Sequence, residues 1–271
     1  MLELYKIKAF IKRDFTILLS YKMALITTTM GTIFPLLTYF FISKLVPGGS
    51  NQDGLSQYGG DYFSFTLIGI AFTTYFTMAV QEFSATTRRD QMAGCLEALL
   101  SSQTDTKSII FMSALFKFIH NGTVLIFMFL VSALFLGFDF SNTNFISLSL
   151  TLILSMIVFI SLGIFSAAGT IIFKQGEPFG LIFGSLSSLL GGAVFPIALL
   201  PASLKILSFI IPITYSLDAL RLSILNGYSI VMLSKQLIIL GIIAIVIFPL
   251  SLKFFEWAVE KGKREGTLMQ Y

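Results

Sequence analysis

The sequence contains very little cysteine, histidine or charge. Its single cysteine, Cys95, excludes an intramolecular disulfide and a cysteine-based metal site. Its single histidine, His120, excludes metal motifs that need a pair of histidines. Only 12% of the 271 residues are charged, whereas a soluble domain has roughly 25%. The composition therefore indicates a membrane protein, and no metal site is expected on the chain.

Motifs for catalysis and for phosphate binding are also missing. The sequence has no G-x-x-x-x-G-K-[ST] loop and no H-E-x-x-H helix, and one histidine leaves no clear Ser-His-Asp set. We therefore expect no catalytic site and no cofactor on this chain, and no ATP hydrolysis by a recognisable route. The formal net charge of +4 is not gathered in one patch, so nucleic acid is not expected as a partner.

Long hydrophobic stretches dominate the sequence, with 55% hydrophobic residues and 29 phenylalanines. Six runs are long enough to cross the hydrocarbon core of a bilayer, which takes about 20 helical residues. They lie near residues 23–46, 62–83, 108–136, 146–173, 179–200 and 236–257. We therefore predict an all-α, polytopic membrane protein with six transmembrane helices, forming a single domain over residues 1–271 in contact with the lipid bilayer.

Shorter helices are predicted beside these spans. Residues 3–20 combine apolar and basic side chains in the manner of an amphipathic helix that lies in the membrane interface. Residues 203–225 hold two apolar pieces that are too short to span, separated by Pro212 and preceded by Pro201. This pattern predicts two short re-entrant helices, whose non-helical backbone must be covered by protein or water.

Lysine and arginine lie mostly on one side of the predicted spans. With the N-terminus inside, the outer segments hold only Lys205 and Arg221, with Lys44 and Lys235 at span edges. The inner segments hold Lys6, Lys8, Lys12, Arg13, Lys22, Arg88, Arg89, Lys107, Lys174, Lys261, Lys263 and Arg264. By the positive-inside rule, both termini and residues 84–107 are expected in the cytoplasm, and the protein in the plasma (cytoplasmic) membrane.

The segment 88–102 is the most regular amphipathic stretch that is expected to face water. Read as a helix, it carries one apolar stripe made of Met92, Leu96, Leu99 and Leu100. Such a helix can dock against a soluble partner. The alternative is an ordinary solvated connection between two spans, and the pattern alone leaves both open.

A row of small residues begins just before the fifth apolar run. Its members lie four residues apart and are Gly176, Gly180, Gly184, Ser188 and Gly192. Small residues on one face let helices approach closely. The row predicts either a subunit interface or packing inside one subunit.

Polar residues interrupt the third run. Lys117, His120 and Asn121 lie where ionisable and amide groups are costly unless they face protein or a water-filled cavity. They are candidates for lining a substrate path. The favoured alternative is structural, because Lys117 would sit only about 16 Å along a helix that starts near residue 106 and its amine can extend to the membrane surface.

Asp218 and Arg221 are three residues apart in the second short helix, a spacing that allows an ion pair. Such a pair would pin the re-entrant hairpin or act in a gate. The alternative is a solvated pair of small energetic value.

Two stretches resemble the type-2 ATP-binding-cassette (ABC) permease family. Residues 94–102, Gly-Cys-Leu-Glu-Ala-Leu-Leu-Ser-Ser, are similar to its G-T-L-E-x-L-L-x-[ST] segment, with Cys95 in place of the usual Thr. Residues 195–221 are similar to its F-P-x-x-x-L-P and N-P-x-T-Y-x-x-[DE]-x-x-R patterns, with Ile211 in place of the usual Asn. The matching positions there are Phe195, Pro196, Leu200, Pro201, Pro212, Thr214, Tyr215, Asp218 and Arg221.

The resemblance implies an exporter permease that dimerises, as a homodimer, and binds two copies of a cytoplasmic ABC ATPase subunit, which carry the ATP and Mg. It implies that residues 88–102 are the coupling helix, with its contacts to the ATPase among Arg88, Arg89, Gly94, Leu96, Glu97, Leu99 and Leu100. It also implies an outer gate made of Phe195, Pro196, Pro201, Pro212, Thr214, Tyr215, Asp218 and Arg221. Lys117, His120, Asn121, Gly180 and Gly184 remain candidates for the path or for packing.

The family branch that exports drugs, lipids or peptides is favoured by this resemblance, and a glycan or polymer exporter is the alternative within the family. A channel or ion-coupled carrier is a less favoured reading, since it would want acidic residues in mid-span, whereas Glu82 and Glu256 lie at span ends. A membrane enzyme is the weakest reading, because no acid–base or nucleophile set is present.

Overall fold

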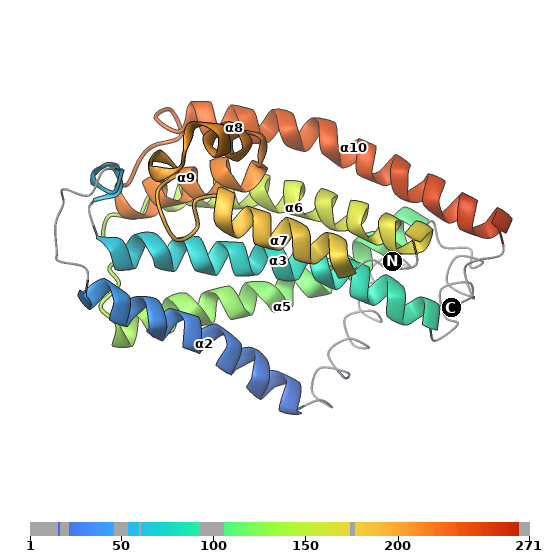
Figure 1. Ribbon diagram of the computed structural model, residues 1–271, viewed down its shortest axis with the longest axis horizontal. Helices are drawn as coiled ribbons and strands as arrows, with labels where there is room; N and C mark the ends of the chain where they lie inside the picture. The colour runs from blue at the N-terminus through green and yellow to red at the C-terminus, as the bar shows by residue number, and fades with distance from the viewer. Residues whose placement is uncertain are drawn as a thin grey trace.

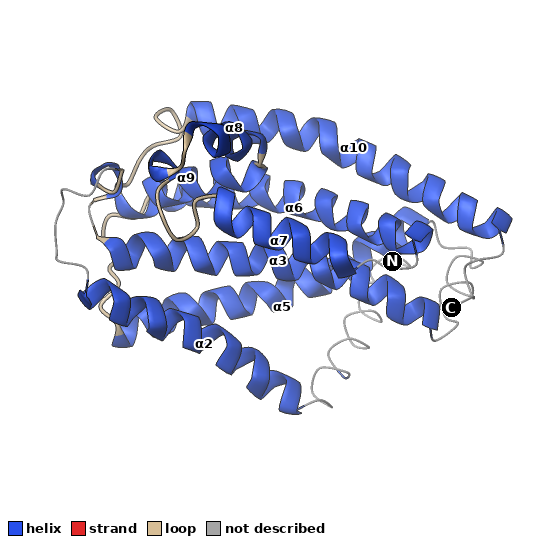
Figure 2. Cartoon of the chain, in the orientation of Figure 1, coloured by secondary structure: helices blue, strands red, loops and turns tan. Residues whose placement is uncertain are grey.

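The computed structural model describes residues 16, 22–45, 54–59, 61–92, 106–173 and 177–265. These residues form a bundle of long helices that run along one direction, and no strand occurs among them (Figures 1 and 2). The predicted all-α class is therefore confirmed. The predicted interfacial helix at 3–20 lies outside the described residues, apart from Thr16.

The helices follow the hydrophobic runs closely. Their bounds are α2 Lys22–Leu45, α3 Tyr62–Met92, α5 Thr106–Phe135, α6 Phe145–Phe173, α7 Glu177–Leu190, α8 Ala202–Ile210, α9 Pro212–Leu225 and α10 Ser234–Glu265, with the 3-10 turns η1 Ser56–Tyr58 and η2 Ile197–Leu199. Among the described residues, α3, α6 and α10 are long and apolar enough to cross a membrane, and the α8–α9 pair, bent by 87°, makes a fourth if it counts as one span. The count of six spans stays a prediction.

The expected fifth span at 179–200 is wrong as a single helix. Helix α7 ends at Leu190 after 14 residues, which corresponds to about 21 Å and is less than the hydrocarbon core requires. The chain then turns at Gly191 and Gly192. Gly192 has φ of +73°, a backbone conformation that glycine adopts without the steric cost of a Cβ atom. The turn was not predicted because residues 179–200 form an uninterrupted apolar run that is long enough for a span.

The second span was predicted to end near residue 83 and a separate helix to begin at residue 88, and this separation is wrong. Helix α3 continues without interruption to Met92, so residues 88–92 form its last turns. Residues 93–102 lie outside the described residues.

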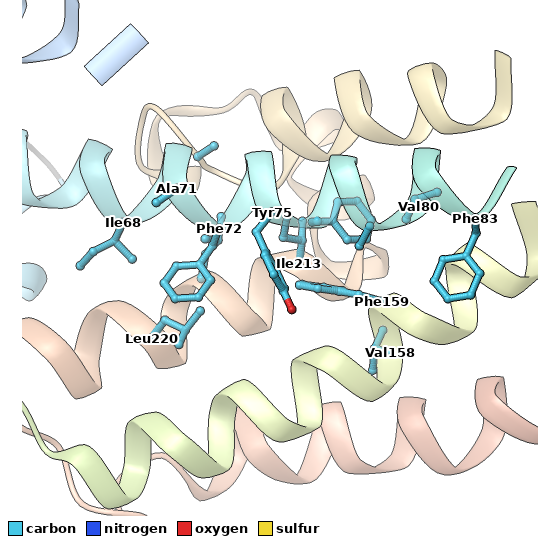
Figure 3. Packing of buried hydrophobic residues seen from close by; sticks show 14 of the residues in the cluster. Ile68, Ala71, Phe72, Tyr75, Val80, Phe83, Val158, Phe159, Ile213 and Leu220 are labelled. Atoms are coloured by element: carbon cyan, nitrogen blue, oxygen red, sulfur yellow. The ribbon is translucent and has the colours of Figure 1, made fainter. Parts of the chain in front are cut away.

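Helix α3 forms the centre of the bundle, in contact with α2, α5, α6, α7 and α9, while α10 packs on α6 and α9. In its most apolar stretch, α3 is 72% buried inside the bundle, against 22% for α10. Figure 3 shows side chains of α3, among them Phe72 and Tyr75, facing Leu220 of α9 and Phe159 of α6. The Phe76 and Phe159 rings are 4.6 Å apart at their centroids, in an edge-on arrangement. Helix α3 is thus the core element, and most of α10 lies on the outside of the bundle.

Hydroxyl groups and glycines bring the helices close together. Ser84 of α3 shares a hydrogen bond with Ser166 of α6, and the Ser155 hydroxyl of α6 donates to the Ser216 hydroxyl of α9 over 2.9 Å. A Cβ atom at Gly184 would lie 2.7 Å from the Thr77 side chain of α3. Gly184 therefore packs directly on α3, and a subunit interface along the small-residue row stays a prediction. The surroundings of Gly180 are outside the description, and Gly192 lies beyond the helix.

The starts of α3 and α6 follow from their preceding residues. The Asp61 carboxylate accepts hydrogen bonds from the backbone N–H groups of Phe63 and Ser64, and the Asn144 side chain accepts one from Ser147 N–H. These are N-caps, which satisfy N–H groups that lack partners in the first turn.

Gly69 of α3 marks the closest approach in the bundle. We expect Gly69→Ala to destabilise the protein by at least about 2 kcal/mol. The reason is that the added Cβ would lie 1.8 Å from the Ala193 carbonyl oxygen and 2.5 Å from Arg221 Nη2. The measurement is thermal unfolding of the purified protein in detergent. Gly241→Ala in α10 is the matched control, because nothing lies within 4 Å of the position that its added Cβ would take, and an unchanged stability of Gly69→Ala would contradict the close approach.

Candidate functional site

Arg221 ties three separate parts of the chain together from α9. It is 3% exposed. Its Nε and Nη2 groups donate to the Phe65 carbonyl oxygen of α3 over 3.2 and 3.0 Å. Its Nη1 and Nη2 groups donate to the carbonyl oxygens of Gly192 and Ala193 over 2.9 and 2.8 Å. The guanidinium also lies 3.4 Å from the centroid of the Phe65 ring, a contact that favours a cation electrostatically. Arg221 therefore fixes the turn after α7 and the hairpin helix α9 against α3.

The predicted ion pair between Asp218 and Arg221 is wrong. Asp218 accepts instead from the Tyr58 hydroxyl over 2.6 Å and from Gln236 Nε2 over 2.7 Å. Three residues along a helix permit contact but do not require it, and here Arg221 turns toward backbone carbonyls of α3 and of the turn after α7. Asp218 consequently joins η1, α9 and the start of α10.

The Tyr58 hydroxyl stays protonated and donates a hydrogen bond to Asp218. Burial raises the pKa of Tyr58 above its ordinary value, and the negative charge and the hydrogen bond of Asp218 raise it further. The phenol is therefore protonated at neutral pH, so it remains a hydrogen-bond donor to the carboxylate.

The bend between α8 and α9 is formed by Pro212, Thr214 and Tyr215, three of the residues that match the permease pattern. Pro212 is the first residue of α9, where its missing N–H costs nothing. The Thr214 hydroxyl donates to the Ser208 carbonyl over 2.7 Å, and the Tyr215 hydroxyl donates to the Phe209 carbonyl over 2.8 Å. Both bonds satisfy carbonyls at the C-terminal end of α8. Ile211, the residue at the N-cap position, provides no side-chain cap, so these two hydroxyls hold the corner.

The other predicted gate residues lie on the connection that leads into this hairpin. Pro196 precedes η2 and Pro201 precedes α8, each as the N-cap residue. Phe195, just before them, lines a groove of ≈ 720 Å³. Five of the eight predicted gate residues, Pro196, Thr214, Tyr215, Asp218 and Arg221, line one cavity, and Pro201 and Pro212 begin the helices α8 and α9 beside it, in the left part of Figure 1.

The groove is bounded by α2, α3 and α7 and has a polar lining. Tyr39 of α2 and Val194 lie at its sides. Besides the phenol of Tyr39, six side chains of the lining carry an aliphatic hydroxyl or an amide, and these are Thr73, Thr74, Thr77, Gln81, Ser185 and Ser188. The Thr73 hydroxyl is buried and has no hydrogen-bond partner in the described part of the chain. A surface of this kind suits water or a polar group of a ligand better than it suits lipid tails.

Sequence reasoning missed this groove and the partners of Asp218. Thr73, Thr77 and Gln81 recur at intervals of four in an apolar span, a signal that the sequence does contain. Tyr58 and Gln236 carry no such signal, since they lie 160 and 18 residues from Asp218.

The predicted coupling and path residues are described only in part. Arg89 lies in the last turns of α3, where its Nη2 group is 3.4 Å from the Glu82 carboxylate, and Arg88 is its neighbour. The remaining coupling residues, Gly94, Leu96, Glu97, Leu99 and Leu100, lie outside the described residues. Lys117 and His120 belong to α5 but their side chains are not described, whereas Asn121 is 5% exposed and its Nδ2 group lacks a described partner.

Comparison with known proteins settles the family. A family model described as ABC-2 type transporter matches residues 5–225, well over half of the chain. The chain belongs to the ABC-2 type transporter family. The match includes α9 up to its last residue, and so it contains Arg221, Asp218 and the α8–α9 corner. No curated protein sequence matches the chain.

Membership makes this chain a membrane subunit of an ABC transporter. Permeases of the ABC-2 family work with a cytoplasmic ATPase that is a separate subunit. The absence of a phosphate-binding loop from the sequence agrees with this division of labour. The permease also has the multi-pass membrane character that its apolar helices indicate.

Because its hydrogen bonds go to backbone carbonyls, Arg221 is expected to matter first for stability. We predict that Arg221→Lys destabilises the permease by roughly 2–4 kcal/mol, since a single amine cannot serve three carbonyl groups in this geometry and each buried group left unpaired costs about 1–3 kcal/mol. Thermal unfolding in detergent measures this. Arg264→Lys is the control, because that side chain is 83% exposed and lies 4.0 Å from Glu260. A variant of Arg221 as stable as wild type but defective in transport would restore the gate reading.

Proposed function

We propose that this permease is the membrane subunit of an ABC exporter for a hydrophobic or amphipathic substrate such as a drug, a lipid or a peptide. Two copies enclose the translocation path, and two copies of a cytoplasmic ATPase subunit, carrying ATP and Mg, drive it. Both termini lie in the cytoplasm and the complex resides in the plasma (cytoplasmic) membrane.

The observation that carries this proposal is the polar groove between α2, α3 and α7. In a lone subunit its hydroxyl and amide groups would face hydrocarbon, where unpaired polar groups cost several kcal/mol each. A second subunit across the groove removes this cost by closing a water-filled path. Apolar and aromatic members of the same lining, such as Met78, Leu189 and Phe195, supply contacts for an amphipathic molecule.

The remaining helices support six spans per subunit. Helices α2 and α5 contain 24 and 30 residues, more than the about 20 that a crossing requires. Helix α7 is short, but its connection to α8 continues the run at the η1 end. Arg88, Arg89, Lys261, Lys263 and Arg264 lie at the opposite end, on the last turns of α3 and α10, which supports a cytoplasmic location for that end.

The path as lined in the described residues favours amphipathic cargo over glycans. Two aromatic side chains, Tyr39 and Phe195, face it beside the six hydroxyl and amide groups. A glycan exporter of the same family remains the alternative, and an ion-coupled carrier or channel a more distant one. Glu82 and Glu256 lie at the ends of the apolar runs 62–83 and 236–257, ten and nine residues before α3 and α10 end, so neither is a mid-span carboxylate of the kind that ion coupling uses.

Water access to the groove can be tested with single cysteines in a Cys95→Ser background. We expect Ser185→Cys to react with a membrane-impermeant maleimide in nanodiscs, because Ser185 is exposed and lines the groove and a thiolate forms only in water. Ile245→Cys is the control, since it is 76% exposed on α10 where lipid tails would cover it. Equal labelling of both positions, or none of Ser185→Cys, would sink the path assignment.

The coupling role of residues 88–102 requires a separate test. The permease is purified from its native cell as bait, and the preparation is assayed for ATPase activity. We expect an ATPase at one copy per permease, and Glu97→Arg should lower its recovery at least about tenfold, equivalent to 1.4 kcal/mol. Glu260→Arg, a charge reversal at an exposed site on α10, should leave recovery unchanged. If the Glu97→Arg complex assembles and transports as well as wild type, the coupling assignment is wrong.

A further inference from the structure

A second cavity lies at the η1 end of the bundle and shares no lining residue with the groove. Its volume is ≈ 300 Å³, the lower end of the range of about 300–1,000 Å³ found for small-molecule sites. Side chains from η1, α8, α9 and the first turn of α10 surround it. These elements meet at the left end of Figure 1.

Four charged side chains line this cavity, and two of them already have their partners. Arg221 is engaged with three backbone carbonyls, and Asp218 accepts hydrogen bonds from Tyr58 and Gln236. The other two are Lys205 of α8 and Lys235 of α10. In the described part of the chain, neither ammonium group makes an ion pair or a hydrogen bond. The lining thus has an excess of two positive charges, on groups that are free to bind an anion.

Helix α8 presents two different faces. Lys205 and Phe209, four residues apart, line the cavity. Ile206 and Ile210, also four apart, are 66% and 71% exposed and face away from it. Phe209 keeps 51% of its surface exposed, so it stands at the mouth. A cationic cavity is therefore bordered directly by an exposed apolar helix.

One more polar group in the cavity lacks a partner. The Nε2 group of Gln236 donates to Asp218, which fixes the orientation of the amide, and the buried Oε1 atom then has no hydrogen-bond partner among the described residues. A carbonyl oxygen accepts only from a donor. A ligand that satisfies the whole lining would carry an anion and, close to it, a hydroxyl or ammonium group.

We propose that this cavity binds the phosphate-bearing, anionic headgroup of an amphiphile, whose apolar tail lies along the exposed face of α8. Lys205 and Lys235 hold the phosphate through charge-assisted hydrogen bonds. Gln236 Oε1 accepts from a hydroxyl or ammonium group of the same headgroup. Arg221 and Asp218 shape the cavity and do not bind the ligand. The site is distinct from the translocation path, and it does not depend on the export activity.

The test is binding to the purified permease in detergent, measured by native mass spectrometry with phosphatidylglycerol as the probe. We expect the double variant Lys205→Gln, Lys235→Gln to raise the dissociation constant at least about tenfold, the change for 1.4 kcal/mol. The control is the double variant Lys44→Gln, Lys253→Gln, because neither of those lysines lines the cavity. The melting temperature of the cavity variant should equal that of wild type, since the described structure gives its two lysines no partners to lose. Equal affinity in both double variants would overturn the proposal.

Two further arms separate a headgroup from free phosphate. Ile206→Gln should weaken the binding of phosphatidylglycerol, because it removes an apolar contact to the tail. It should leave the binding of inorganic phosphate, measured by competition, unchanged. Ile245→Gln on α10 should change neither binding constant. Inorganic phosphate that displaces the lipid poorly supports an amphiphile site. Inorganic phosphate that binds as tightly as the lipid, with Ile206→Gln without effect, would show that the cavity binds free phosphate and that the tail contact is wrong.

Discussion

The burial of one guanidinium group, that of Arg221, organises the η1 end of the molecule. A fully desolvated arginine is costly unless its donors are satisfied, and here the donors reach carbonyls of α3 and of the turn after α7. The carbonyl groups of that turn can accept these hydrogen bonds because α7 ends at Leu190 and the backbone changes direction at Gly192, where φ is positive. Gly69 leaves the space for this contact. The contacts of Arg221 therefore depend on the early end of α7, on the turn that follows it and on the position of α9 together.

The same polar residue types serve two purposes in this permease. Inside the subunit, Ser155 and Ser216 bond to one another, so hydroxyls and small residues replace the hydrophobic effect that lipid removes between transmembrane helices. At the groove, Thr73, Gln81 and Ser185 line space that no described element of the subunit fills. The difference lies in what covers each group. A membrane protein that leaves hydroxyls uncovered on one face needs water or a partner subunit there.

Much of the helical layout was predictable because a span must be long and apolar. The bounds of α2, α5 and α6 lie within two residues of the predicted runs. The hairpin was also predictable, because Pro212 cannot continue a preceding helix and its flanking pieces are short. The fifth span was not, since Gly191 and Gly192 occur in an uninterrupted apolar run and only the contacts of Arg221 explain why the helix ends there. The three-residue spacing of Asp218 and Arg221 allowed an ion pair between them, whereas in the structure each side chain has other partners.

The sequence by itself determined that this is an all-helical membrane protein, which segments are apolar, and which family it resembles, because hydropathy and local motifs are properties of contiguous residues. Only the tertiary structure decided the partners of Asp218 and Arg221, the end of α7 and the residues that face the groove. Those features join segments up to 160 residues apart. A side chain in a helix has several acceptors within reach, and which one it takes depends on the backbone that packing brings beside it.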